Sequence, residues 1–145
     1  MDERQLAPWR AFLYAHALLI RRIEDDLRER GLPPLGWYDV LWPLHEAPER
    51  RLRMNELADK VVLSRTGLVR LVDRLERAGL LRREAVPEDG RGSYAAITAE
   101  GVAVLRRMWP VYRRHIEDDF LAPLGADAVR VRVAFERVAE AGVRA

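Results

Sequence analysis

Hydrophobic positions in the first third of the chain recur with the period of a helix. From Trp9 to Leu27 they fall three or four residues apart, as on one face of an amphipathic helix. A glycine and two prolines within residues 31–34 end this helix, which we place at about residues 8–30. A second helix is predicted from Leu35 to Glu46. It should kink or break just before Pro43, because proline lacks the amide hydrogen that a helix interior uses.

The middle of the chain contains two shorter helical patterns. They follow a predicted polar loop at residues 48–51 and cover about residues 54–61 and 65–78. Ser64 directly precedes the second of these helices, where its hydroxyl is suited to cap the free amides of the first turn. Gly79 follows that helix at the position where glycine commonly ends one.

Extended and helical patterns alternate in the rest of the chain. Residues 80–86 and 93–97 are predicted to be strands, and the turn residues between them make the pair a β-hairpin. A long helix follows from about Thr98 to Phe120, and a last helix from about residue 126 to 141. The valines of the last segment also alternate as in a strand, but its longer pattern favours a helix.

The long helix that begins at Thr98 is apolar on two sides. One stripe runs from Val102 to Phe120, and a second runs from Val104 to His115. A helix with two apolar sides needs more than its own domain to bury it, so the pattern predicts a second copy of the chain as a partner.

The order of the middle elements predicts the fold class. A helix, a short helix, a turn, a longer helix and a hairpin follow one another as in a winged helix-turn-helix. We therefore predict a mainly α fold with a small β-hairpin wing, flanked by long N- and C-terminal dimerisation helices. The 145 residues are expected to form a single domain. Within it, the winged helix-turn-helix lobe covers about residues 35–98, and the dimerisation helices cover about residues 8–30 and 98–141.

Composition limits the class of protein to which the chain can belong and the kinds of functional site that it can contain. Apolar residues make up 49% of the chain and charged residues 33%, which is typical of a soluble globular protein. No apolar run approaches the ~20 residues of a membrane span and no signal-peptide pattern is present, so we expect a cytoplasmic protein without membrane contact. The chain has no cysteine, and its three histidines lie far apart in sequence. We therefore expect no catalytic residues, no metal and no cofactor.

Positive charge is concentrated in the middle of the chain. Residues 50–91 contain eleven basic and seven acidic residues, a net charge of +4, whereas the rest of the chain carries −2. A basic segment within a larger scaffold is the electrostatic footprint of a nucleic-acid-binding surface.

The predicted helix at residues 65–78 has an apolar side and a polar side. At about 100° per residue its leucines and Val72 cluster on one face. The pattern fits a recognition helix, whose back packs on the scaffold while guanidinium and hydroxyl groups meet base edges and phosphates. It also fits an ordinary amphipathic helix with solvated arginines. The basic charge of the region, and an arginine at the hairpin tip within reach of a minor groove, favour the recognition helix. The polar positions are Ser64, Arg65, Thr66, Arg70, Asp73, Arg74 and Arg77.

Several stretches of the middle region share the pattern of a known family. They are Asn55–Ala58, Leu63–Glu76, Gly79–Arg83, the wing pattern Asp89-x-Arg91 and the following Ile97-Thr98-x-x-Gly101. In this combination, which covers about a third of the chain, the sequence resembles the MarR family of multiple-antibiotic-resistance-type regulators.

The resemblance implies a function and a set of site residues. The family's members are homodimeric transcription regulators, many of them repressors, that bind pseudo-palindromic operators in double-stranded DNA. Many respond to small aromatic or phenolic acids. By the same resemblance, Asp89 is the acid that shapes the wing and Arg91 is the arginine at its tip. The DNA-facing residues of the recognition helix are Ser64, Arg65, Thr66, Gly67 and Arg70.

Asp73 has three open interpretations. It pairs with Arg77 four residues later, it pairs with an arginine at the base of the wing, or it is a plain surface acid.

An effector pocket is predicted from aromatic residues, with His16, Trp37 and Trp42 as its candidate lining. Aromatic residues at helical spacing also occur simply as core. His16 interrupts an apolar face, and three roles stay open for it: a satisfied buried histidine, a pH-sensitive dimer contact, or a hydrogen-bond partner for an acidic ligand.

Two other classes of function fit the sequence less well than DNA binding does. A winged helix used only for protein–protein contact predicts an apolar or acidic exposed face on residues 63–78, and the arginines there disfavour it. An enzyme needs a convergent set of nucleophile, base or metal ligands, and the sequence contains no such set.

Overall fold

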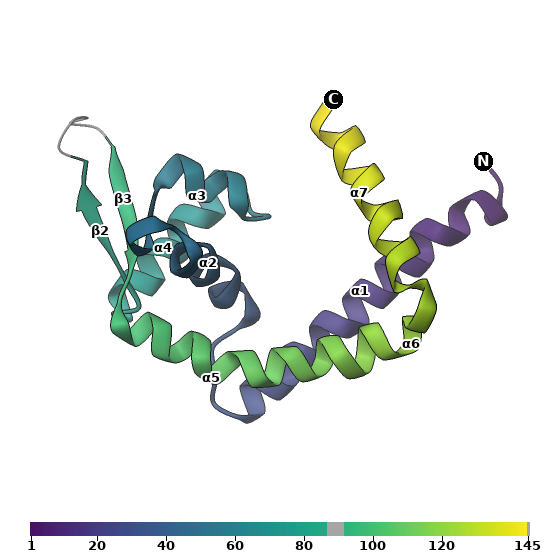
Figure 1. The fold of residues 1–145 in the computed structure, drawn as a ribbon, viewed down its shortest axis with the longest axis horizontal. Coiled ribbons are helices and arrows are strands. Elements are labelled where there is room, and N and C mark those ends of the chain that lie inside the picture. Colours follow the sequence, from purple (N-terminus) through teal and green to yellow (C-terminus); the bar gives the residue numbers. More distant parts are fainter. Residues whose placement is uncertain (87–91, 145) are drawn as a thin grey trace. The chain divides into compact units, whose positions relative to one another are not determined.

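The computed structural model describes residues 1–86 and 92–144, which form two compact units. One unit combines Met1–Arg22 with Tyr112–Ala145, and the other spans Ile23–Val111. Two long helices, α1 (Glu3–Glu29) and α5 (Ala99–His115), contribute residues to both units (Figure 1). The expectation of a single domain stays a prediction.

The first unit is built from helices alone. After the end of α5 come a π-helical turn at Ile116–Leu121, α6 (Ala122–Leu124) and a 3-10 turn at Gly125–Asp127. The chain then continues as α7 (Ala128–Arg144). Phe12 of α1 and Phe135 of α7 lie with their ring centroids 5.5 Å apart.

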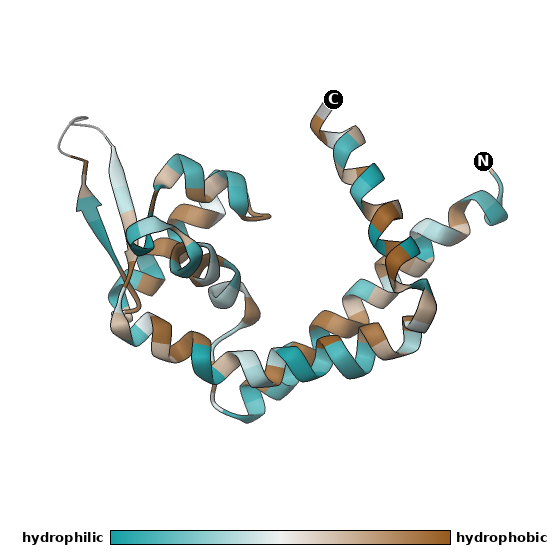
Figure 2. Ribbon diagram, viewed as in Figure 1, coloured by the Kyte–Doolittle hydropathy of each residue, from teal (hydrophilic) through white to brown (hydrophobic). Residues whose placement is uncertain are grey.

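This first unit buries none of its described residues. Large apolar side chains are instead exposed on α1 and α7, which carry apolar segments along their lengths (Figure 2). The unit therefore lacks an interior of its own. Its exposed apolar residues include Trp9, Phe12, Leu13, Tyr14, Val129, Val133, Phe135 and Val138.

The described residues of the second unit form a small antiparallel sheet, three α-helices and a 3-10 turn, beside the ends of α1 and α5. The strand order is β1 (Arg51–Arg53), β3 (Ser93–Ile97) and β2 (Leu81–Ala85). The helices are α2 (Leu35–Glu46), a 3-10 turn at Pro48–Arg50, α3 (Met54–Lys60) and α4 (Arg65–Arg77).

The hydrophobic core of the protein lies in this second unit. Every long element of the unit contributes fully buried apolar side chains, so α4 and the sheet are held by one continuous set of contacts. The largest of these residues are Leu27, Val40, Leu41, Leu44, Leu57, Leu68, Val72, Leu75, Leu81 and Met108.

Most elements predicted from the sequence are confirmed. The second helix has the predicted bounds, the helix after Ser64 ends one residue early, and both strands of the hairpin are present. The first helix begins earlier than predicted, at Glu3, and the last one extends to Arg144. None of the described helices combines the length and the apolar character needed to cross a membrane.

Two local predictions are corrected by the structure, and a third is confirmed in a modified form. The helix α2 continues through Pro43 without the predicted break, and Ala47 donates to the Pro43 carbonyl at 3.1 Å, while a kink at this position stays a prediction. Residues 48–51 are not simply a polar loop, since Arg51 begins a strand that pairs with β3. The long helix reaches the predicted end near Phe120, but it is α-helical only to His115 and continues as a π-helical turn over Ile116–Leu121.

Candidate functional site

The helix α4 is fixed at both ends by the residues predicted to do so. The Gly67 amide donates to the Ser64 side-chain oxygen at 3.0 Å, which satisfies one of the free amides of the first turn. At the other end Gly79 adopts a left-handed conformation, with φ of 76°, and its amide donates to the Glu76 carbonyl. Both ends of α4 are therefore capped.

The two faces of α4 differ as the sequence predicts. Leu68, Val72 and Leu75 are buried in the core of the second unit. The opposite face is exposed and carries Arg65, Thr66, Arg70, Arg74 and Arg77. Within the described part of the chain, none of these arginines forms an ion pair.

Gly67 is partly buried at the start of the helix. A Cβ atom at this position would lie 3.1 Å from the Ser64 hydroxyl oxygen, which is a tight contact. Glycine here therefore leaves room for the cap. The assignment of Gly67 to the DNA-facing residues stays a prediction.

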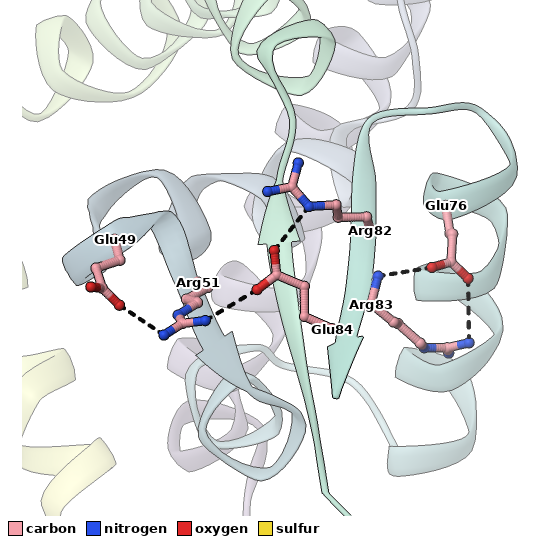
Figure 3. Close-up of polar contacts among 6 residues, drawn as sticks. All are labelled: Glu49, Arg51, Glu76, Arg82, Arg83 and Glu84. Carbon is pink, nitrogen blue, oxygen red and sulfur yellow. Dashed lines mark hydrogen bonds and ion pairs between the residues drawn. The ribbon is translucent and has the colours of Figure 1, made fainter. Parts of the chain in front are cut away.

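The acidic residues of α4 are bound by an arginine of the wing. The Arg83 guanidinium on β2 lies 2.7 Å from the Asp73 carboxylate and 3.7 Å from that of Glu76. The Arg83 amide also donates to Glu76 at 2.8 Å (Figure 3). Of the interpretations open for Asp73, the pairing with an arginine at the base of the wing is therefore confirmed. We call this set of three residues the α4–wing clamp.

A second polar network joins the outer strands of the sheet. The Glu84 carboxylate on β2 accepts hydrogen bonds from Arg82 at 2.9 Å and from Arg51 of β1 at 3.1 Å (Figure 3). Arg51 also pairs with Glu49 at 2.9 Å and lies over the Tyr94 ring of β3, 4.3 Å from its centroid. The hydrogen bonds from Arg82 and Arg51 lower the pKa of the Glu84 carboxyl.

The junction between α4, the wing and α5 is closely packed around Thr98. Its hydroxyl donates to the Gly79 carbonyl at 2.6 Å and accepts from the Gly101 amide at 3.1 Å, so it also caps α5. A Cβ atom on Gly101 would lie 2.2 Å from the Leu80 carbonyl oxygen, closer than real contacts allow. The spacing Thr98-x-x-Gly101 is therefore a packing requirement.

The candidate effector residues are distributed over both units. His16 belongs to the first unit, where its ring centroid lies 6.0 Å from that of Phe12. Trp42 belongs to the second unit and stacks on Tyr38 at 6.0 Å, and Tyr38 in turn stacks on Trp109 at 6.2 Å. Trp37 of the same helix is partly buried. A shared pocket for His16, Trp37 and Trp42 stays a prediction.

Comparison with known proteins identifies the family. The model described as "MarR family" matches residues 30–92. The crystal structure of Sco3205 from Streptomyces coelicolor, a MarR family transcriptional regulator in complex with DNA, is 32% identical and superimposes with a TM-score of 0.89. That match covers 98% of this chain and 89% of the other. The chain belongs to the MarR family.

Two further relatives match over nearly the whole chain. The PcaV transcriptional regulator from Streptomyces coelicolor, solved in complex with its natural ligand, is 32% identical with a TM-score of 0.75 over 98% of this chain and 99% of that one. The regulator MhqR from Bacillus subtilis is 27% identical over 131 residues, 90% of this chain and 88% of MhqR. The protein is thus a winged-helix transcriptional regulator that binds DNA.

The predicted wing corresponds to the hairpin of β2 and β3, and two of its predicted residues, Asp89 and Arg91, lie outside the described residues. No group of three or more histidines and acids that could hold a metal ion occurs in the residues that the model describes.

Sequence reasoning missed the residues that hold the wing in place. Helical or strand spacing does not predict the pairs Arg83–Glu76 and Arg51–Glu84, whose residues lie 7 and 33 positions apart in sequence. One signal was available, since Arg51-Leu52-Arg53 alternates polar and apolar residues as an edge strand does.

Proposed function

We propose that the protein is a repressor that acts as a homodimer on a pseudo-palindromic operator. In this proposal α4 of each protomer enters the major groove and the wing reaches the adjacent minor groove, while Asp89 and Asp73 shape the wing. The residues assigned to DNA are Ser64, Arg65, Thr66, Gly67, Arg70 and Arg74 of the α4 region and Arg91 of the wing.

One observation carries the assignment of α4 to DNA. The acids Asp73 and Glu76 are engaged by Arg83, whereas the exposed arginines of α4 form no ion pair within the described residues. The charge left unneutralised on the exposed face is therefore positive, as a phosphate-rich partner requires. The similarity to a relative solved in complex with DNA supports the same assignment.

The homodimer is supported by the composition of the first unit. Its described residues include no buried one, and its exposed aromatic and aliphatic side chains form an apolar surface on α1 and α7. Such a surface is stable in water only when it is covered, and a second copy of the same unit offers a self-complementary cover. A dimer seated across a promoter excludes other proteins from that DNA, which is the simplest route to repression.

The proposal includes release from DNA by a small aromatic acid bound by His16, Trp37 and Trp42. A ligand releases the protein from DNA only if it binds more tightly to a form of the dimer in which the distance between the two recognition helices does not match the spacing of the half-sites. Two half-sites about one helical turn apart tolerate little change in that spacing. The exposed ring of Trp42, stacked on the buried ring of Tyr38, is suited to a planar ligand, and the relative PcaV was solved with its natural ligand.

Tryptophan fluorescence tests the effector proposal. Phenolic acids titrated into the protein should quench the tryptophans, and operator DNA should weaken that response because the two ligands favour different forms. The assignment of the ligand to His16, Trp37 and Trp42 is contradicted if operator DNA does not change the quenching. It is also contradicted if the quenching remains after both His16 and Trp42 are replaced.

The DNA-binding proposal is tested by two arginine variants and a control. Operator fragments are first selected from the genome with the purified protein, and binding is then followed by fluorescence anisotropy. Arg70→Ala should cost on the order of 1–3 kcal/mol and relax discrimination at one base position. Arg91→Ala should weaken all sequences alike and reduce the salt dependence by about one phosphate contact. Arg130→Ala removes the same charge from an exposed position of α7 and is the control.

One result would contradict the placement of α4 and the wing on DNA. Negligible effects from both Arg70→Ala and Arg91→Ala, with Arg130→Ala equally neutral, would remove the basis for placing α4 and the wing on DNA.

A further inference from the structure

The exposed face of α4 contains one large apolar side chain, Val69, among its charged residues. The side chain of Val69 is 47% exposed. Five large apolar residues of the second unit are exposed among those described, and three of them, Val62, Leu63 and Val69, fall within eight consecutive positions. Single exposed apolar residues need no explanation, but this local concentration at the start of the candidate recognition helix does.

The position of Val69 on the helix separates it from Arg70 and Arg74. At about 100° per residue, Val69 lies on the flank of α4 that also carries Asp73 and Glu76, whereas Arg70 and Arg74 lie on the other flank. The α4–wing clamp holds those two acids against Arg83 of β2. Val69 lies one turn before the clamp and one turn after Arg65, which shares this flank at the capped end of α4.

The chemistry of Val69 limits what it can recognise in DNA. Its isopropyl group neither donates nor accepts a hydrogen bond, and it gains nothing from a phosphate. In the major groove the thymine C5-methyl group is the apolar feature of the base edges. Contact between the two removes apolar surface of both from water.

We propose that Val69 is a specificity-determining residue that reads the methyl group of a thymine in each operator half-site. The inference rests on the proposed function, because it requires α4 to lie in the major groove. It assigns the two flanks of α4 different tasks. Arg70 and its neighbours bind polar base edges and phosphates, and Val69 selects thymine by its methyl group.

Replacing thymine by uracil tests this inference, because uracil differs from thymine only by the lost methyl group. Each thymine of a selected operator is replaced singly, and the affinities of the full-length wild-type protein and of Val69→Ala are measured by anisotropy. For the wild type, one position per half-site should show a loss of about fourfold, the value of one buried methyl-sized group. For Val69→Ala the same replacement should have no effect, and Val69→Ile should retain the preference for thymine.

Val62→Ala is the matched control. It removes the same side chain from an exposed position of the turn before α4. This variant should keep the full thymine-to-uracil difference at the position that Val69→Ala makes insensitive.

The outcomes separate the inference from the function on which it rests. If the protein binds no operator, both fail together. If the protein binds operator DNA but no thymine is sensitive to replacement by uracil, the role of Val69 is wrong while the DNA-binding function stands. The same conclusion follows if the sensitive position responds equally in Val69→Ala, or if Val62→Ala abolishes its sensitivity. Unchanged melting temperatures show that each variant is folded.

Discussion

At the scale of single residues, local spacing predicts orientation but not partners. The exposed and buried sides of α4 follow from the rotation of 100° per residue, and the Ser64 cap follows from the residue type that precedes the helix. The partner of Asp73 could not be chosen from spacing, because Arg83 reaches it only after the chain has turned back at Gly79. The same limit applies to Glu84 and Arg51, which come from strands far apart in sequence.

The Glu84 network predicts a pH-dependent contribution to stability. A carboxyl whose pKa is lowered by folding stabilises the fold above its ordinary pKa of 4.5, and this stabilisation is lost as the pH falls through the lowered value. The variant Glu84→Gln should therefore be less stable than the wild type near neutral pH, and the difference should shrink below about pH 4.5. Urea denaturation across this range measures it. Glu46→Gln, which changes an exposed acid of α2, should show no such convergence, and a constant difference for Glu84→Gln would refute the role of the network.

At the scale of elements, long periodic segments were predicted well and short or irregular ones were not. The helices α2 and α4 and the hairpin strands carry clear periodicity, whereas β1 has three residues and alternates too briefly to be distinguished from a loop. The π-helical turn after His115 has no periodic signature, and the His115 and Asp119 side chains that meet across it at 2.6 Å are also suitably spaced for an ordinary helix.

The junction of α4, the wing and α5 predicts an intolerance to any side chain at residue 101. Gly101→Ala would place a Cβ 2.2 Å from the Leu80 carbonyl oxygen and 2.7 Å from Ile97, so the backbone must shift. We expect a loss of about 1–3 kcal/mol in the free energy of unfolding. Gly142→Ala is the control, because nothing lies within 4 Å of its Cβ and alanine favours a helix. Equal stabilities of the two variants would show that the junction is not tightly packed.

At the scale of the whole molecule, the two compact units differ in what they bury. The second unit contains the buried core and the α4–wing clamp, and the first unit exposes its apolar side chains on α1 and α7. The sequence did not indicate this difference through the two apolar sides of the helix beginning at Thr98, because Leu105 on one side and Met108 on the other are both buried within the second unit. It could not indicate that the boundary between the units falls within α1 and α5, because helical periodicity continues unbroken through both.

A footprint on a genomic operator tests the central claim most directly, since it reports DNA binding, symmetry and spacing together. Cleavage protection by the wild-type protein should reveal two half-sites related by two-fold symmetry, with centres about one helical turn, ~34 Å, apart. Guanines or adenines in the major groove at the middle of each half-site should be shielded by α4. A single protected site without symmetry, or no protection at salt concentrations where a basic surface binds DNA, would contradict the account of a dimer that reads its operator through α4.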